Sequence, residues 1–280
     1  DDRHGLYDEA NEHDGCGVAL VARLNGVPVH ETIQRALQSL CNMEHRGGEG
    51  ADHLTGDGAG ISLQVPDRLF RAVSGVELPE PGRYGVIVCF LPQDARRRVE
   101  LEQLLVARVE AAGQAALGWR DVPVRPDQIG RVAREAAPVI RQLFVAAGAD
   151  VPADADGEAF ERKLYVIHRS AEIASGEELT IPSCSSRTIV YKGMLAANQV
   201  PRFFPDLTDE RIESALALVH SRFSTNTFPN WRLAHPFRLL AHNGEVNTLT
   251  GNVNWMRARE AQLESELLGN DLKKVLPALR

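Results

Sequence analysis

The chain has 280 residues, of which 44% are apolar and 25% charged, as in an ordinary soluble globular protein with a buried core. Lys and Arg number 31 and Asp and Glu 38, and the resulting charge of −7 argues against a general nucleic-acid-binding protein, which needs a basic face. No apolar run approaches membrane-spanning length, and the opening residues lack the basic flank and apolar stretch of a signal peptide, so we expect a soluble, cytoplasmic protein.

The first third of the sequence predicts strands separated by a helix. From Ile33 to Leu40 apolar residues recur at helical spacing, and the glycines of HRGGEG should end this helix. The predicted strands are mostly apolar runs, of the kind that is buried in a sheet, at residues 16–24, 60–65 and 84–90.

The rest of the chain continues the mixture of helices and strands. Residues 95–180 are rich in Arg, Ala and Glu and read as helical, with apolar stripes at 101–112 and 160–171. Strands are expected again at 187–193, 215–223 and 237–246, and a last helix at 252–268. This pattern predicts one α+β domain in which helices cover sheets.

The four cysteines are far apart and show no spacing typical of metal ligands, so we expect no metal site built from them. Cys41 and Cys89 fall on apolar segments and are expected to pack in the core. Cys184 lies in the polar stretch IPSCSSRT, which reads as a loop, and no role follows for it. Cys16 differs because it stands between two glycines directly before the first predicted strand.

Four stretches carry more glycine, histidine and asparagine than strand ends need. Each also has a structural reading: GDGAG is a turn into a strand, and HNG is a hairpin turn. His220, His235 and His242 match no helical ligand pair, so hydrogen-bonded histidines are favoured over a metal site. The four stretches are residues 14–18, 44–60, 220–237 and 242–252.

Taken together, these stretches resemble the N-terminal class II glutamine amidotransferase domain of glutamate synthase large subunits. The resemblance covers nearly the whole chain, including the middle region that related amidotransferases lack. It rests on the segments CGVALVA, MEHRGGEGAD, GDGAGI, YGVIVCFLPQD, LGWRDVPV, FERKLYVI, SSRTIVYKGML, HSRFSTNTFPNWRLAHPFRLLAHNGEVNTLTGNVNWMRARE and LKKVLP. It implies the N-terminal nucleophile hydrolase fold, an α+β four-layer α/β/β/α sandwich.

The resemblance also implies a nucleophile. In the family the first residue of the mature chain attacks, and its free α-amino group acts as the base. Residues 1–15 then resemble a leader that is cleaved between Gly15 and Cys16, leaving an amidotransferase domain over 16–280. A thiol is a strong nucleophile, and an α-amino group with a pKa of roughly 7.7–8.0 exchanges its proton near neutral pH. The alternative is a buried free cysteine at the start of a strand.

Further site residues follow from the same resemblance. Asn243 and Gly244 match the oxyanion hole, and Arg222 matches the arginine that binds the substrate α-carboxylate. The alternative for Arg222 is a surface ion pair. Residues expected to line or support the substrate site are Arg46, Thr225, His235 and, by strand alternation with Arg222, His220.

The expected activity is hydrolysis of L-glutamine through a Cys16 thioester, with the ammonia used to make glutamate from 2-oxoglutarate. No cofactor is expected in this chain; FMN and an iron–sulfur cluster are implied for other domains of the parent enzyme, which is an oxidoreductase. The partners implied are those synthase domains or an electron-donating subunit, with no nucleic acid and no membrane.

The expected domain is truncated at its C-terminal end. In the family an aspartate in a Ser-Asp-Ser stretch, shortly after LKKVLP, binds the α-ammonium group, whereas this chain ends at Arg280. An unprocessed or truncated silent domain and a stand-alone glutaminase subunit remain as alternatives. A phosphoribosyl-pyrophosphate amidotransferase is disfavoured by TIVYKGML and by the long middle region.

Overall fold

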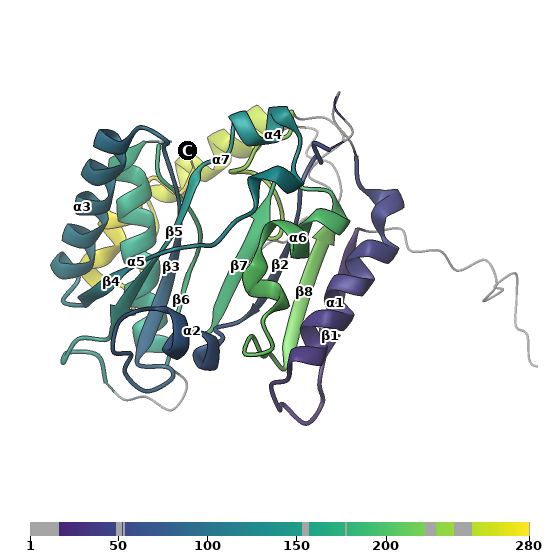
Figure 1. The fold of residues 1–280 in the computed structure, drawn as a ribbon. Helices are drawn as coiled ribbons and strands as arrows, with labels where there is room; N and C mark the ends of the chain where they lie inside the picture. Colours follow the sequence, from purple (N-terminus) through teal and green to yellow (C-terminus); the bar gives the residue numbers. More distant parts are fainter. Residues whose placement is uncertain are drawn as a thin grey trace, which may run out of the picture.

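The computed structural model of the chain describes residues 17–48, 52, 54–152, 157–176, 178–221, 228–237 and 248–279. These residues form two antiparallel four-stranded sheets with helices packed against them (Figure 1). The predicted α+β class, with sheets covered by helices, is confirmed.

The first sheet is formed by four strands in the order β1-β8-β2-β7. These strands are β1 (Val18–Ala22), β8 (Leu216–Ser221), β2 (Ala59–Gln64) and β7 (Thr188–Gly193). All neighbouring pairs are antiparallel, so strand beginnings and strand ends alternate along each end of the sheet.

The second sheet has the order β4-β5-β3-β6. Its strand β3 (Tyr84–Leu91) is buried along its whole length, which explains why every residue of the run YGVIVCFL is apolar or glycine. It pairs with β5 (Val139–Ala146) and β6 (Thr180–Ser185), and β4 (Ala115–Asp121) forms the edge beyond β5.

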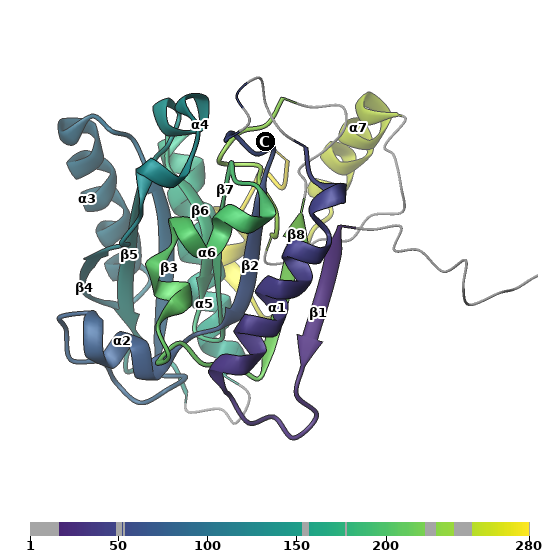
Figure 2. The same ribbon diagram turned by 45° about the vertical axis from the view of Figure 1, so that its right-hand side comes forward.

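Helices cover both sheets. Helix α1 (His30–Asn42) buries Ile33 and Leu40 against the first sheet and lies across β8 and β1 (Figure 2). Helices α3 (Ala95–Ala111) and α5 (Glu158–Ser175) pack on the second sheet. The remaining helices and helical turns are α2 (Asp67–Val73), α4 (Arg131–Glu135), α6 (Val200–Phe203), α7 (Leu249–Glu260), η2 (Glu44–Arg46), η3 (Pro126–Gln128), η4 (Ala197–Gln199), η5 (Pro205–Thr208) and η6 (Gly269–Lys274).

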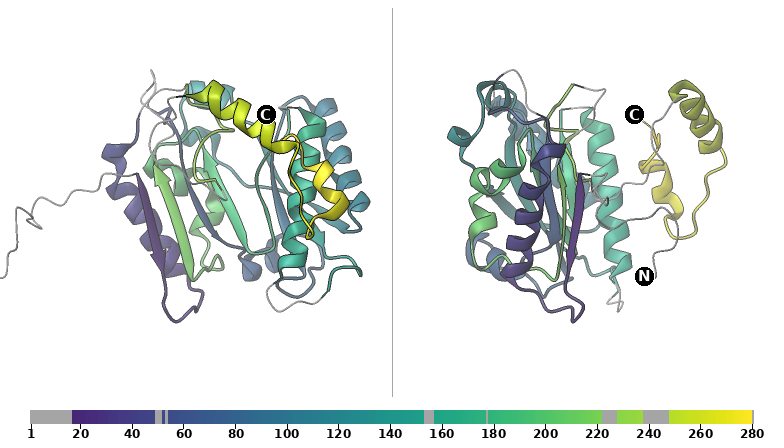
Figure 3. Two further views of the ribbon diagram at one scale, coloured as in Figure 1. Left: turned by 180° about the vertical axis from the view of Figure 1, so that it is seen from behind. Right: turned by 90° about the vertical axis from the view of Figure 1, so that its right-hand side faces the viewer.

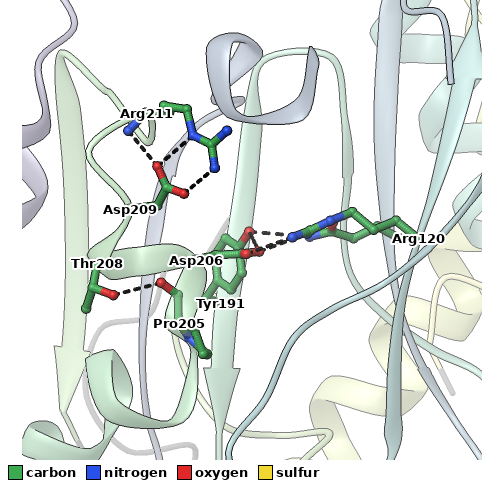
Figure 4. A network of polar contacts seen from close by, with 8 residues as sticks. Arg120, Tyr191, Pro205, Asp206, Thr208, Asp209 and Arg211 are labelled. Atoms are coloured by element: carbon green, nitrogen blue, oxygen red, sulfur yellow. Dashed lines mark hydrogen bonds and ion pairs between the residues drawn. The ribbon is translucent and has the colours of Figure 1, made fainter. Parts of the chain in front are cut away.

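A buried ion pair joins the two sheets and the segment before β8 (Figure 4). Arg120 of β4 donates to both carboxylate oxygens of Asp206 in η5, at 2.7 and 2.8 Å, and to Gln142 of β5 at 2.8 Å. The Tyr191 hydroxyl of β7 donates to the same carboxylate at 2.9 Å. Because all four side chains share hydrogen bonds, this network fixes how the two sheets meet.

Most predicted elements are confirmed. The predicted strands at 16–24, 60–65, 84–90, 187–193 and 215–223 correspond to β1, β2, β3, β7 and β8, and the helical stripes correspond to α1, α3 and α5. The predicted strand 237–246 lies outside the described residues, except for Phe237.

The helical reading of residues 95–180 is wrong in part, because β4 and β5 lie within this range. β4 has no alternation of apolar and polar residues, and its side chains are mostly half-buried. It is a strand because it pairs with β5 at the edge of the sheet, a tertiary contact that overrides local propensity.

Two further expectations are corrected. Cys184 lies buried in strand β6 and not in a loop; the neighbouring Ser185 and Ser186 are buried too, and both hydroxyls donate to Glu161. The last helix, α7, ends at Glu260 and not at residue 268. Helix α7 lies on the outside of the molecule (Figure 3), and none of its residues is buried. It therefore lacks the tertiary packing that would stabilise a longer helix.

Candidate active site

One end of the first sheet gathers segments that are far apart in the sequence. Ala59, at the start of β2, pairs with Ser221 at the end of β8 and with Gly193 at the end of β7. The Ser221 amide donates to the Gly17 carbonyl, just before β1, at 2.7 Å. The antiparallel topology therefore brings three of the four polar stretches found in the sequence to one place, which we call the Gly17 end.

Three of the predicted site residues, Arg46, His220 and His235, are described by the structure. The leader 1–15 lies outside the described residues, as do His242, Cys16, Arg222, Thr225, Asn243 and Gly244. Two of these residues are nevertheless joined by peptide bonds to the hydrogen-bonded pair at the Gly17 end: Cys16 to Gly17, and Arg222 to Ser221.

The structure places Arg46 beside Gly17. A Cβ atom placed on Gly17 would lie 2.2 Å from the Ser221 carbonyl oxygen and 3.7 Å from the Cβ of Arg46. Position 17 therefore requires glycine, because β1 approaches the end of β8 too closely for any side chain. Arg46 closes η2, and the next residue, Gly47, lies against the Ser221 hydroxyl.

His220 and His235 stack on each other beside the same end. Their ring centroids are 4.5 Å apart at an interplanar angle of 22°. His220 pairs across the sheet with Gly60, and a Cβ on Gly60 would lie 2.8 Å from the His235 carbonyl oxygen. Gly60, the last glycine of GDGAG, thus leaves room for the segment 231–237 to lie directly on the sheet. Among the described residues, no group of His, Cys, Asp and Glu is placed to hold a metal.

Trp231 anchors the start of this segment. It is 4% exposed, its indole N–H donates to the Ala133 carbonyl at 2.9 Å, and its ring lies edge-on to Phe90. A Cβ on Gly193 would lie 2.3 Å from the Trp231 ring, so a second strand glycine is required by the same segment. The glycines of β2 and β7 therefore hold residues 231–237 against the first sheet.

Lys192 is a buried cation of this region that motif reasoning missed. It stands in the same cross-strand row as His220 and Gly60, and it is 1% exposed. Its ammonium group donates to the Arg232 carbonyl at 3.2 Å and lies 4.2 Å from the centre of the Phe237 ring. Burial lowers the pKa of Lys192 to about 7. The available signal was a single lysine inside the apolar run TIVYKG.

Of the three cysteines that the structure describes, Cys89 and Cys184 lie in the core, whereas Cys41, also expected there, is only partly buried. Cys89 is fully buried, and burial raises the pKa of its thiol; burial also raises the pKa of Cys41. The thiol of Cys184 donates to the Leu164 carbonyl at 3.3 Å. Cys41 and Cys89 therefore lack the lowered pKa that marks a reactive thiol.

Comparison with known proteins identifies the family. A family model for the class-II glutamine amidotransferases matches residues 16–280. The chain belongs to this family. Its α+β architecture, with two antiparallel sheets packed with helices, is that of the N-terminal nucleophile hydrolase type. No helix in the described part of this amidotransferase is both long and apolar enough to cross a membrane.

The similar curated proteins are glutamate synthases. The chain is 50% identical, over 98% of its length, to the glutamate synthase [NADPH] large chain of Bacillus subtilis (strain 168). It is 41% identical to the corresponding chain of Azospirillum brasilense over 98% of its length, and 40% identical to ferredoxin-dependent glutamate synthase 1 of Arabidopsis thaliana over 97%. It spans only 18%, 18% and 17% of the lengths of these relatives.

Proposed function

We propose that this chain hydrolyses L-glutamine to L-glutamate and ammonia at the Gly17 end of the first sheet, with Cys16 as the nucleophile. The observation that carries the proposal is the hydrogen bond from Ser221 to Gly17, beside Arg46. This hydrogen bond joins Gly17 and Ser221, the residues next to Cys16 and Arg222 in the sequence. The match to the family model begins at Cys16, which supports the same assignment.

The chemistry is acyl transfer through a thioester. The Cys16 thiol gives its proton to the α-amino group of the same residue, and its sulfur attacks the amide carbon of glutamine. Ammonia leaves with that proton. Water then attacks the thioester, which releases glutamate and restores the thiol. The amine is available as a base only when the Gly15–Cys16 bond has been cut, so residues 1–15 act as a leader that keeps the site silent.

Substrate and transition state are held by residues that follow the sheet. Asn243, through its side-chain amide, and Gly244, through its backbone N–H, donate to the developing oxyanion; losing one such donor costs roughly 10²–10³ in rate. The planar guanidinium of Arg222 grips the α-carboxylate of glutamine with two hydrogen bonds. Arg46, Thr225 and His235 line or support this pocket, and the stack on His220 orients His235.

The ammonia supplies glutamate synthesis from 2-oxoglutarate in the synthase domains of a longer protein. The names of the relatives, which specify NADPH, NADH or ferredoxin, support this assignment. FMN and an iron–sulfur cluster belong to those other domains. Cys89 and Cys184 are buried in separate strands, and the described cysteines form no ligand cluster, so they do not fit a cluster of this kind.

The proposal is tested by glutamate release from glutamine, measured on the full chain after intact-mass analysis of its N-terminus. A chain that begins at Cys16 should be active, and Cys16→Ala in the same processed form should release no glutamate. Cys41→Ser, which changes a partly buried thiol in α1, is the matched control and should keep its rate within about twofold. Hydrolysis by processed Cys16→Ala at the wild-type rate would rule out the mechanism.

A further inference from the structure

Lys192 carries a charge that the described structure does not balance with a carboxylate contact. Its ammonium group donates a hydrogen bond to the Arg232 carbonyl and lies over the face of the Phe237 ring. The residue is almost completely buried. An ammonium group has three N–H donors, and one carbonyl satisfies one of them. Burying such a group costs free energy unless its charge and its donors are matched.

Glu172, whose charge influences Lys192, makes its described contacts with other residues. Glu172 of α5 accepts from the Ile181 amide at 3.0 Å and lies 3.6 Å from the guanidinium of Arg169 and 3.4 Å from the His168 ring. Burial lowers the pKa of Lys192 to about 7, and the charge of Glu172 opposes this shift only in part. The lysine is therefore a site where an additional anion would be stabilised.

A cavity adjoins this ammonium group. Its volume is about 340 Å³, at the lower end of the range for ligand pockets, so it suits a small molecule. Arg232 lines it as a second cation, and Ile181, Leu233 and Phe237 are among its apolar walls. Among the described residues, the titratable groups that line the cavity together with Lys192 are Arg232, Tyr165, His168 and Glu172 of α5, and Cys184 of β6.

The cavity is separate from the Gly17 end in the part of the chain that the structure describes. It is lined by α5, β6, the end of β7 and residues 232–237, and none of Gly17, Arg46 or Ser221 borders it. Lys192 is the residue by which the first sheet borders the cavity, and the other lining strand, β6, belongs to the second sheet.

We propose that this cavity binds a short aliphatic carboxylate, whose carboxylate group pairs with the Lys192 ammonium and whose carbon chain lies on Ile181, Leu233 and Phe237. The pairing supplies a counter-charge and uses N–H donors for which the described residues provide no acceptor. The apolar walls select against fully hydrated inorganic anions, because these bring no apolar surface to bury. Binding at this site is independent of the thiol chemistry proposed for Cys16.

The test is calorimetric titration of the full chain with glutarate, and with glutaramide as the uncharged control of the same length. Glutarate should bind saturably and glutaramide at least tenfold more weakly. Lys192→Met should weaken glutarate binding at least tenfold, and Arg232→Gln should weaken it by a smaller factor. Lys163→Met, which removes a lysine of α5 outside the cavity, should leave the affinity unchanged.

Proton uptake gives a second readout that a structural role for Lys192 does not produce. At pH 8 a lysine with a pKa near 7 is mostly neutral, and a bound carboxylate favours the ammonium form, so binding should take up a proton. The observed heat should then vary with the ionisation heat of the buffer, and Lys192→Met should lose this dependence.

Three results would overturn the proposal: no saturable glutarate binding, unchanged affinity in a folded Lys192→Met protein, or binding by wild type without proton uptake at pH 8. If Lys192→Met does not fold, the buffer dependence of wild type and the effect of Arg232→Gln decide the question. Repeating the titration with Cys16→Ala separates this inference from the proposed glutaminase activity, because the carboxylate should bind equally well to that variant.

Discussion

Arg120 and Lys192 are two buried cations in strands of different sheets, and their surroundings differ. Arg120 is held by both oxygens of Asp206, which also accepts from Tyr191. Lys192 has a backbone carbonyl and an aromatic ring as its described contacts. The first arrangement stabilises the charge and raises the pKa of Arg120, whereas the second lowers the pKa of Lys192 to about 7.

Arg120 therefore has a structural role, whereas Lys192 can change its protonation state near neutral pH. A buried pair with matched hydrogen bonds has one protonation state and one geometry, so it defines how the two sheets meet. A buried lysine without a paired carboxylate can change its charge near neutral pH, and any ligand or segment that supplies an anion changes its state. Substitutions in the two regions test whether they differ in this way.

The largest effect on stability is expected for Asp206→Ala. The substitution leaves the Arg120 guanidinium buried and without its carboxylate, and breaking such a pair costs about 3–5 kcal/mol of unfolding free energy. Asp209→Ala is the matched control, because its pair with Arg211 is substantially exposed and such pairs contribute at most about 1 kcal/mol. Urea unfolding measures both; equal losses would contradict the structural role of the Arg120 network.

Gly60→Ala should lower both activity and stability, because a Cβ there would lie 2.6 Å from the Tyr191 carbonyl oxygen of the paired strand. A Cβ there would lie 2.6 Å from the Cβ of Lys192 and 2.8 Å from the His235 carbonyl oxygen, so residues 231–237 must move away from the sheet. Misplacing groups that support a catalytic site costs roughly 10²-fold in rate. Glutamate release should fall by about this factor. Gly75→Ala, where nothing lies near the added Cβ but φ is +72°, controls for a loss of stability caused away from residues 231–237.

The stability of the wild type should rise with pH in a way that depends on Lys192. The folded-state pKa is lowered from 10.5 to about 7, so between these values the unfolded chain binds more protons than the folded one. Stability therefore increases as pH rises through this window, by about 2 kcal/mol from pH 7 to 9. Unfolding of wild type and Lys192→Met at both pH values measures it; a constant difference would mean that Lys192 stays charged in the folded protein.

The smallest expected effect is that of Arg222→Lys on glutamine binding. A lysine keeps the charge but cannot form two parallel hydrogen bonds with the α-carboxylate, so KM should rise by about tenfold with little change in kcat. Steady-state glutamate release measures both constants. A drop in kcat with unchanged KM would move Arg222 from substrate binding to the chemical step.

Elements that depend on neighbouring residues were predicted from the sequence, whereas elements that depend on contacts between distant residues were missed. The all-apolar run of β3 and the helical spacing of Ile33 and Leu40 report burial within one element, and both predictions were confirmed. β4 was missed because it is a half-buried edge strand whose only strong determinant is its pairing with β5. Cys184 was placed in a loop because buried serines look like loop residues until their acceptor, Glu161, is brought beside them.

The sequence by itself determined the α+β class, most of the helices and strands, and the family, because each leaves a signature in neighbouring residues or in an ordered set of motifs. Only the tertiary structure decided that Gly17 lies against Ser221, that Gly60 makes room for His235, and that Lys192 is a buried cation beside a cavity. These features depend on which strands pair and in which register. That choice is made by contacts between distant parts of the chain, which no local pattern records.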